Sequence, residues 1–168
     1  RSARGERDRH RRLLSRLLDA AAALGRDQHG LRAAQPRRHG HDRTTGAVYR
    51  NSHAADPVWT ASTIKLAMVV DLLTRQRAGS IALSDADNRL ITAMLHSSDD
   101  DAADTLGYDL GSGSLEQFYA EMDARARDLG LADTSYSSAS GLNDDNNYSS
   151  ALDQAALSRF ALGNPTFA

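Results

Sequence analysis

The sequence contains no cysteine among its 168 residues. This absence excludes disulfide bonds, thiolate metal sites, a cysteine nucleophile and lipid attachment through cysteine, although it leaves the redox compartment open. Long hydrophobic runs are missing as well, because no apolar stretch approaches the ~20 residues that a membrane-spanning helix needs. We therefore expect no transmembrane segment.

Lysine is almost absent, since Lys65 is the only one in a chain that uses arginine freely. An arginine guanidinium stays protonated in proteins, whereas a lysine amine can be deprotonated and act as a base. Ser62 precedes Lys65 by three residues, so in a helix the amine can reach the serine hydroxyl one turn away. This spacing is typical of an activated nucleophile. Chance spacing, in a gene whose coding bias favours arginine, is the alternative.

The size and charge of the chain are typical of one globular domain. With 40% apolar residues it can bury a moderate core. The net charge of −2 hides an asymmetry, because residues 1–50 are basic and residues 99–153 are acidic. We expect the middle and end of the chain to form the folded unit.

The first 43 residues are predicted to lie outside that unit. Residues 1–24 combine arginines with a leucine and alanine stripe, and Arg16 and Asp19 interrupt the apolar part, so an amphipathic helix fits better than a secretion signal. Residues 26–43 have no helical or alternating pattern and indicate a disordered linker without a strand. We place the domain boundary near Thr44, with the folded domain spanning residues 44–168.

Local signals in residues 44–168 predict a helix-rich body with short strands. A turn at Thr45-Gly46 precedes one strand at residues 47–49, and a second strand follows at residues 58–60. A helix from Ser62 is apolar on nearly all sides, which indicates a buried central helix that ends before Gly79. Four further helices are predicted after the N-caps Ser84, Ser98, Ser114 and Ser150.

A second group of polar residues follows at Ser98-Asp99-Asp100, between two predicted helices. Ser98 with Asp101 also fits a simple helix N-cap box, so these residues alone do not decide between structure and chemistry. Their order after Ser62 and Lys65 favours chemistry.

At this point the sequence resembles the penicillin-recognising serine hydrolases, which include D-alanyl-D-alanine carboxypeptidases, low-molecular-weight penicillin-binding proteins and class A β-lactamases. These families carry Ser-x-x-Lys, then Ser-x-Asn, then Lys-Thr-Gly. The first motif matches Ser62-Thr63-Ile64-Lys65, and the second matches Ser98-Asp99-Asp100 with aspartate in place of asparagine. Ser140-Gly141-Leu142 and the segment at residues 148–153 are similar to the carboxypeptidase branch. The resemblance covers residues 46–167.

The resemblance implies a fold and a set of roles. The fold would be α/β (α+β), β-lactamase/transpeptidase-like, with a helix-rich subdomain and an incomplete antiparallel sheet. Ser62 would attack the carbonyl of a D-Ala-D-Ala peptide or a β-lactam, and Lys65 would accept its proton. Ser98 would relay a proton to the leaving group, and Asp100 would bind the substrate amide. The backbone N–H of Ser62 would help to stabilise the oxyanion.

Three departures from the family pattern bear on activity. Lys-Thr-Gly is absent, since the sequence has no second lysine and Arg43-Thr44-Thr45-Gly46 precedes Ser62; we therefore expect a truncated or partly frame-altered relative. Asp100 beside Lys65 would favour the ammonium over the free base. If Leu142-Asn143 matches the Leu-Asn pair of class A β-lactamases, Ala139 replaces their deacylating glutamate, which argues against efficient β-lactam hydrolysis.

Other interpretations are weighed against this one. The chain can instead be a catalytically inactive penicillin-binding-like module with the same fold. Nucleic-acid binding by the basic start lacks aromatic residues for base stacking. His29, His39, His41 and Asp42 suggest a metal site without a rigid element to hold it, and the aspartates at 99–101 lack calcium-loop spacing. His96 is read as a helix-end residue rather than a triad base.

We therefore predict a serine-type D-Ala-D-Ala carboxypeptidase or β-lactamase-like hydrolase. Its predicted catalytic residues are Ser62, Lys65 and Ser98, and Asp100 is its predicted substrate-binding residue. We expect no metal and no cofactor. The expected partner is a peptidoglycan peptide or a β-lactam, with no nucleic acid, and the chain is expected to be a monomer. The resemblance alone implies an extracytoplasmic location.

Overall fold

The computed structural model describes residues 37–42, 44–141 and 145–163. The predicted helix at residues 1–24 and the Leu142-Asn143 pair lie outside these residues. The division of the chain into residues 1–43 and 44–168 stays a prediction.

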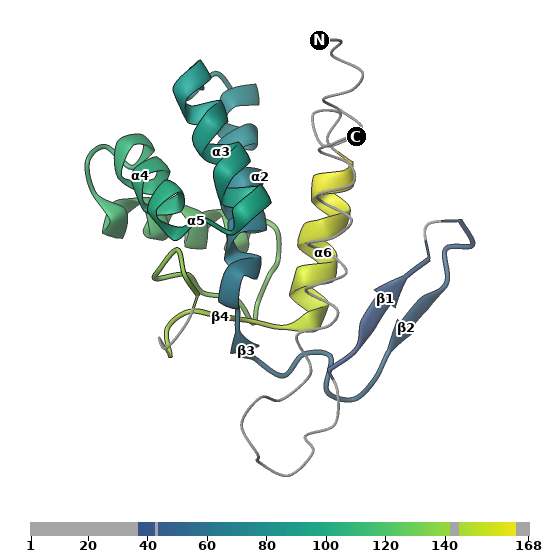
Figure 1. Cartoon of the computed structure of the whole chain (residues 1–168). Helices are drawn as coiled ribbons and strands as arrows, with labels where there is room; N and C mark the ends of the chain where they lie inside the picture. The colour runs from purple at the N-terminus through teal and green to yellow at the C-terminus, as the bar shows by residue number, and fades with distance from the viewer. Residues whose placement is uncertain (1–36, 43, 142–144, 164–168) are drawn as a thin grey trace.

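The described chain forms two small sheets and a group of helices. In chain order the elements are β1 (His39–His41), β2 (Val48–Arg50), β3 (Val58–Trp59), the short 3₁₀ helix η1 (Ala61–Thr63), α2 (Ile64–Arg77), α3 (Asp85–Ser97), α4 (Asp100–Leu110), α5 (Leu115–Asp128), β4 (Tyr148–Ser149) and α6 (Ala151–Leu162). Figure 1 shows α3, α4 and α5 grouped around α2, with α6 between this group and the β1–β2 hairpin.

The helix α2 is the centre of the core, as its sequence predicts. Every residue from Ile64 to Leu72 is buried, including Lys65 and Asp71. Apolar residues from α3, α4, α5 and α6 pack around it, among them Met94, Leu106, Phe118 and Leu157. Burying each of these large side chains stabilises the fold by roughly 1.5–3 kcal/mol. The site described below therefore stands on a rigid element.

Serine side chains cap three of the helices, as predicted. Ser84 accepts a hydrogen bond from the Asp87 amide in a complete capping box at the start of α3. Ser114 accepts from Gln117 at the start of α5, and Ser150 accepts from Asp153 at the start of α6. These caps fix where each helix begins.

The fourth predicted cap was wrong. Asp99, not Ser98, is the N-cap of α4, and its carboxylate accepts from the Ala102 amide at 3.0 Å. Ser98 instead ends α3 in the left-handed region, with φ at 57°. The aspartate one residue further along offers a charged acceptor to the helix N-terminus, where negative charge is favoured. This leaves the Ser98 hydroxyl free of capping.

The strands form two antiparallel pairs. β1 pairs with β2, with Gly40 opposite Tyr49, and β3 pairs with β4, with Trp59 opposite Tyr148. The expectation that residues 26–43 contain no strand was wrong for His39–His41. The Asp42 carboxylate accepts from the Thr44 amide and the Thr45 hydroxyl, and the Asp42 amide donates to the Ala47 carbonyl. This turn chemistry brings β1 beside β2 without an apolar pattern.

Candidate active site

Ser62 lies in the 3₁₀ turn η1, directly before the N-terminus of α2. Lys65 is in the first turn of α2, and its side chain is 1% exposed. The Lys65 Nζ donates a hydrogen bond to the Ser62 Oγ at 3.2 Å. The one-turn spacing in the sequence therefore brings the amine and the hydroxyl together, as the helical geometry requires.

Ser98 approaches Ser62 from the other side. Its hydroxyl donates to the Ser62 Oγ at 2.7 Å, although 36 residues separate the two serines. Ser98 has a left-handed backbone conformation, which ends α3 before α4 begins. The Ser98 side chain therefore does not follow the direction of either helix. The junction between α3 and α4 thus places the Ser98 hydroxyl next to Ser62, the candidate nucleophile.

Asp100 completes the cluster from the first turn of α4. Its Oδ1 lies 2.5 Å from the Lys65 Nζ, and its side chain is 53% exposed, against 1% for Lys65. A buried ammonium needs such a partner, because an isolated charge in the interior costs several kcal/mol. The ion pair joins α2 to α4 and holds Lys65 at the edge of the site. All four residues predicted from the sequence meet at this point.

The cluster can support proton transfer to and from a serine. Ser62 has one basic group and one hydroxyl within hydrogen-bonding reach, which is the arrangement of an activated nucleophile with a relay. Ser98 and Asp100 are exposed, and Ser62 is half-buried. A substrate can therefore approach the serine from solvent, while Lys65 remains covered.

The carboxypeptidase-like segment near the C-terminus has a structural role that the sequence did not reveal. Asp153, at the start of α6, accepts hydrogen bonds from the Asp133 amide at 2.8 Å and the Thr134 hydroxyl at 2.7 Å. Asn147 contacts Thr60, two residues before Ser62. No short motif identifies Asn147, because its partners lie far away in the sequence. Ala139 is buried.

The remaining sequence candidates stay apart from the cluster. His96 is exposed in the last turn of α3, as read from the sequence. His29 lies outside the described residues. Within the part of the chain that the structure describes, no three histidine, aspartate or glutamate side chains gather as metal ligands. The aspartate triplet serves the α4 N-terminus and the Lys65 ion pair instead.

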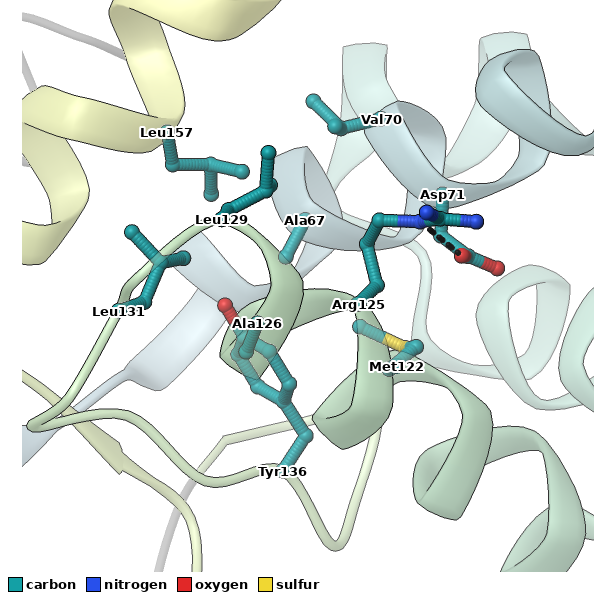
Figure 2. A pocket seen from close by; sticks show the side chains of 10 residues that line it. All are labelled: Ala67, Val70, Asp71, Met122, Arg125, Ala126, Leu129, Leu131, Tyr136 and Leu157. Carbon is teal, nitrogen blue, oxygen red and sulfur yellow. Dashed lines mark ion pairs between the residues drawn. The ribbon is translucent and has the colours of Figure 1, made fainter.

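A second buried charged group, the Asp71 cluster, lies deeper along α2. Its members are Asp71, Arg75 and Arg125, and each arginine has a nitrogen 3.6 Å from an Asp71 oxygen. Figure 2 shows Asp71 and Arg125 on one side of a small hollow between α2, α5 and α6, with Leu129, Leu131 and Leu157 on its apolar side. Burial raises the pKa of Asp71, and the two arginines oppose this rise only in part.

Comparisons with known proteins find similarity to D-alanyl-D-alanine carboxypeptidases. The D-alanyl-D-alanine carboxypeptidase family model matches residues 85–164, which include Ser98 and Asp100 but not Ser62 or Lys65. D-alanyl-D-alanine carboxypeptidase DacF of Bacillus subtilis is 42% identical over 48 residues, which is 29% of this chain and 12% of that protein. The comparisons confirm the resemblance to penicillin-recognising serine hydrolases.

Solved structures extend the similarity to most of the chain. The D-alanyl-D-alanine carboxypeptidase DacD of Francisella tularensis aligns with a TM-score of 0.64 at 21% identity, covering 86% of this chain and 42% of that one. Penicillin-binding protein D2 of Listeria monocytogenes, solved in a cefotaxime-bound form, aligns with a TM-score of 0.59 at 27% identity, covering 73% of this chain and 60% of that one.

These alignments confirm the predicted fold class, a helix-rich α+β arrangement of the transpeptidase type with small antiparallel sheets. The chain spans less than two thirds of the length of each of these relatives. The similarity therefore concerns only a part of each relative.

Proposed function

We propose that this chain carries the nucleophile of a serine hydrolase that acts on D-Ala-D-Ala peptides through an acyl-enzyme on Ser62. One observation carries the proposal, namely that the Ser62 Oγ lies 3.2 Å from the Lys65 Nζ and 2.7 Å from the Ser98 Oγ. The similarity to carboxypeptidases supports the choice of substrate class.

In the proposed reaction the Ser62 Oγ forms a bond to the carbonyl carbon, and its proton passes to the neutral Lys65 amine. The developing oxyanion faces the backbone N–H of Ser62 at the start of the helical turn, a type of interaction worth ~3 kcal/mol per donor. Ser98 then donates its hydroxyl proton to the leaving nitrogen as the peptide bond breaks, and the proton taken up by Lys65 restores the Ser98 hydroxyl. Water hydrolyses the ester and returns Ser62.

Asp100 has two effects in this scheme. Its carboxylate can accept a hydrogen bond from the substrate amide, but, unlike asparagine, it cannot donate one to a substrate carbonyl. Its Oδ1 lies 2.5 Å from the Lys65 Nζ and competes with the Ser62 hydroxyl for that amine. We therefore propose that Asp100 slows the acylation of Ser62.

The same ion pair favours a second candidate function. If the contact between Lys65 and Asp100 never opens, the chain is a catalytically inactive penicillin-binding-like module that keeps the fold without turnover. The two functions differ in whether a covalent bond forms at Ser62.

A labelling experiment separates these functions. The chain and its Ser62→Ala variant are incubated with a fluorescent penicillin, and intact mass measures the adduct. The proposed enzyme gains one penicilloyl group, and the variant gains none. Equal labelling of both proteins contradicts the role of Ser62, and no labelling of either favours the inactive module. The choice of a β-lactam probe follows the cefotaxime-bound relative.

We further propose that the protein works outside the cytoplasm, on peptidoglycan peptides, as a monomer. The similarity to D-alanyl-D-alanine carboxypeptidases supports this proposal. In the described ranges, no helix has the length and apolar character needed to cross a bilayer. Export can be tested by fractionating cells that produce the full-length protein, with a cytosolic enzyme as the control.

A further inference from the structure

The residue before the nucleophile candidate has an unfavourable backbone. Ala61 has φ at 43°, in the left-handed region that residues with a Cβ rarely adopt. Such a conformation costs of order 1–3 kcal/mol and persists only where its surroundings enforce it. Because Ala61 sets the direction in which the chain enters Ser62, whatever enforces this conformation also orients the Ser62 hydroxyl.

Asn147 is one of the groups that surround this backbone. Its side chain is fully buried. Its Oδ1 accepts from the Thr60 hydroxyl at 3.2 Å, and its backbone carbonyl accepts from the Thr60 amide at 3.2 Å. Its Nδ2 donates to the Ser138 carbonyl at 2.8 Å and to the Ser138 hydroxyl at 3.0 Å. Because a carbonyl can only accept, the Ser138 contact fixes which side of the amide faces Thr60.

Gly141 contacts the backbone of Ala61, the residue after Thr60. Its carbonyl accepts from the Ala61 amide at 3.0 Å. A Cβ on Gly141 would lie 2.1 Å from the Ala61 carbonyl oxygen, and Gly141 itself has φ at 66°. Only glycine permits this close approach of the two backbones. Thr60 and Ala61 are therefore held by contacts from Asn147 and Gly141, both far away in the sequence.

We propose that Asn147 and Gly141 are positioning residues for Ser62, and that they act by keeping Ala61 in its left-handed conformation. This inference rests on the proposed serine hydrolase function and names residues that deepen it. Neither residue contacts the Ser62 side chain, whose described partners are Lys65 and Ser98. The contacts act through the backbone, and misplacing a nucleophile by about 1 Å can cost about 100-fold in rate.

The primary test is the Asn147→Ala variant, with Ser138→Ala as its matched control. The control removes one of the two acceptors of the Asn147 amide and keeps the Ser138 carbonyl. We expect penicilloyl-adduct formation per folded molecule to fall about 30-fold to 100-fold in Asn147→Ala and to stay near the parent rate in Ser138→Ala. Circular dichroism measures the folded fraction of each protein.

A rescue experiment distinguishes positioning from simple stabilisation. Glycine adopts positive φ without the Cβ penalty, so Ala61→Gly added to Asn147→Ala should recover most of the lost acylation rate. If Asn147→Ala lowers only the thermal midpoint, while its folded fraction acylates at the parent rate, the positioning role is wrong. Should Asn147→Ala not fold, Thr60→Val, which removes only the hydroxyl contact, gives the same comparison.

Hydrogen exchange of the Ala61 amide separates this inference from the proposed function. In the parent this amide is bonded to Gly141, and we expect its exchange to rise at least tenfold in Asn147→Ala relative to the Leu66 amide of α2. Unchanged exchange overturns the inference whether or not the chain acylates. If the parent forms no adduct but the exchange rises, the positioning contact stands and the proposed hydrolase function fails.

Discussion

Two buried charges on the same helix differ in what surrounds them. Lys65 and Asp71, both on α2, are each 1% exposed. Lys65 meets Asp100, whose side chain is half exposed, and donates to the Ser62 hydroxyl. Asp71 lies between Arg75 and Arg125, at 3.6 Å from each, with neither of its oxygens hydrogen-bonded in the described part of the chain.

The difference fits the role in chemistry proposed for Lys65 and a role in packing for Asp71. The Lys65 cluster opens to solvent through Ser98 and Asp100, so a reacting molecule can reach it. The Asp71 cluster ties α2 to α5, and Arg75 also donates to the Leu110 carbonyl at the end of α4. A buried charge alone therefore does not mark an active site, since an accessible reactive partner is needed as well.

The largest expected effect is on chemistry, in Lys65→Met. Methionine fills the buried path of the lysine chain without an amine, so we expect acylation of Ser62 by penicillin to fall about 1,000-fold through loss of the general base. The thermal midpoint should change little, because Asp100 can be solvated. Arg77→Met, an exposed cation at the end of α2, is the control. A folded Lys65→Met that acylates at the parent rate contradicts the base role.

The second effect is on stability, in Arg75→Met. This change removes the bond to the Leu110 carbonyl, the 2.9 Å ion pair with Glu121 and one of the two partners of Asp71. We expect the free energy of unfolding, from urea titration, to fall by about 3 kcal/mol.

Acylation per folded molecule should stay unchanged in Arg75→Met, and Arg77→Met again serves as the control. Adding Asp71→Asn should recover part of the loss, because the neutral amide leaves no unpaired carboxylate in the core. A strong loss of acylation in the folded Arg75→Met protein would contradict the inference that the Asp71 cluster serves only stability.

A third prediction concerns the contact between Asp100 and Lys65, which Asp100→Asn changes. Without the carboxylate the Lys65 amine has only the Ser62 hydroxyl as its described partner, so we expect acylation to rise about tenfold. Asp101→Asn, on the same turn of α4 but without a described contact to Lys65, is the control. Slower acylation in Asp100→Asn would mean that the carboxylate serves the reaction directly.

The smallest effect is the pH dependence that Asp71 gives to stability. Burial raises the pKa of Asp71 above its ordinary value of 3.8 in the folded protein. Its contribution to stability is thus fully present below that value and is lost as pH rises through the folded pKa. Asp71→Asn should flatten this decline in urea titrations across acidic pH. Because burial also raises the pKa of Asp123, the difference between the two proteins is the quantity to measure.

Local rules in the sequence were enough for most of the helical body. The serine caps and the apolar run of α2 predict their elements because both act within a few residues. Ser62 and Lys65 meet for the same reason. Ser98 and Asp100, more than thirty residues away, could be assigned only from the family resemblance.

The features that sequence reasoning missed depend on long-range contacts or on competition between neighbours. Asp99 replaced Ser98 as the α4 cap because a charged acceptor was one residue further along. β1 formed through the Asp42 turn and not through an apolar pattern. The contacts of Asn147 with Thr60 span 87 residues, and no local pattern indicates them.

The scarcity of lysine has a practical consequence. Because Lys65 is the only lysine, the protein has one side-chain amine, and that amine lies inside the cluster with Ser62. Protein labelled with ¹⁵N-lysine should give a single ammonium resonance, free of overlap. That signal is a built-in reporter through which each proton movement at the serine can be followed during a reaction.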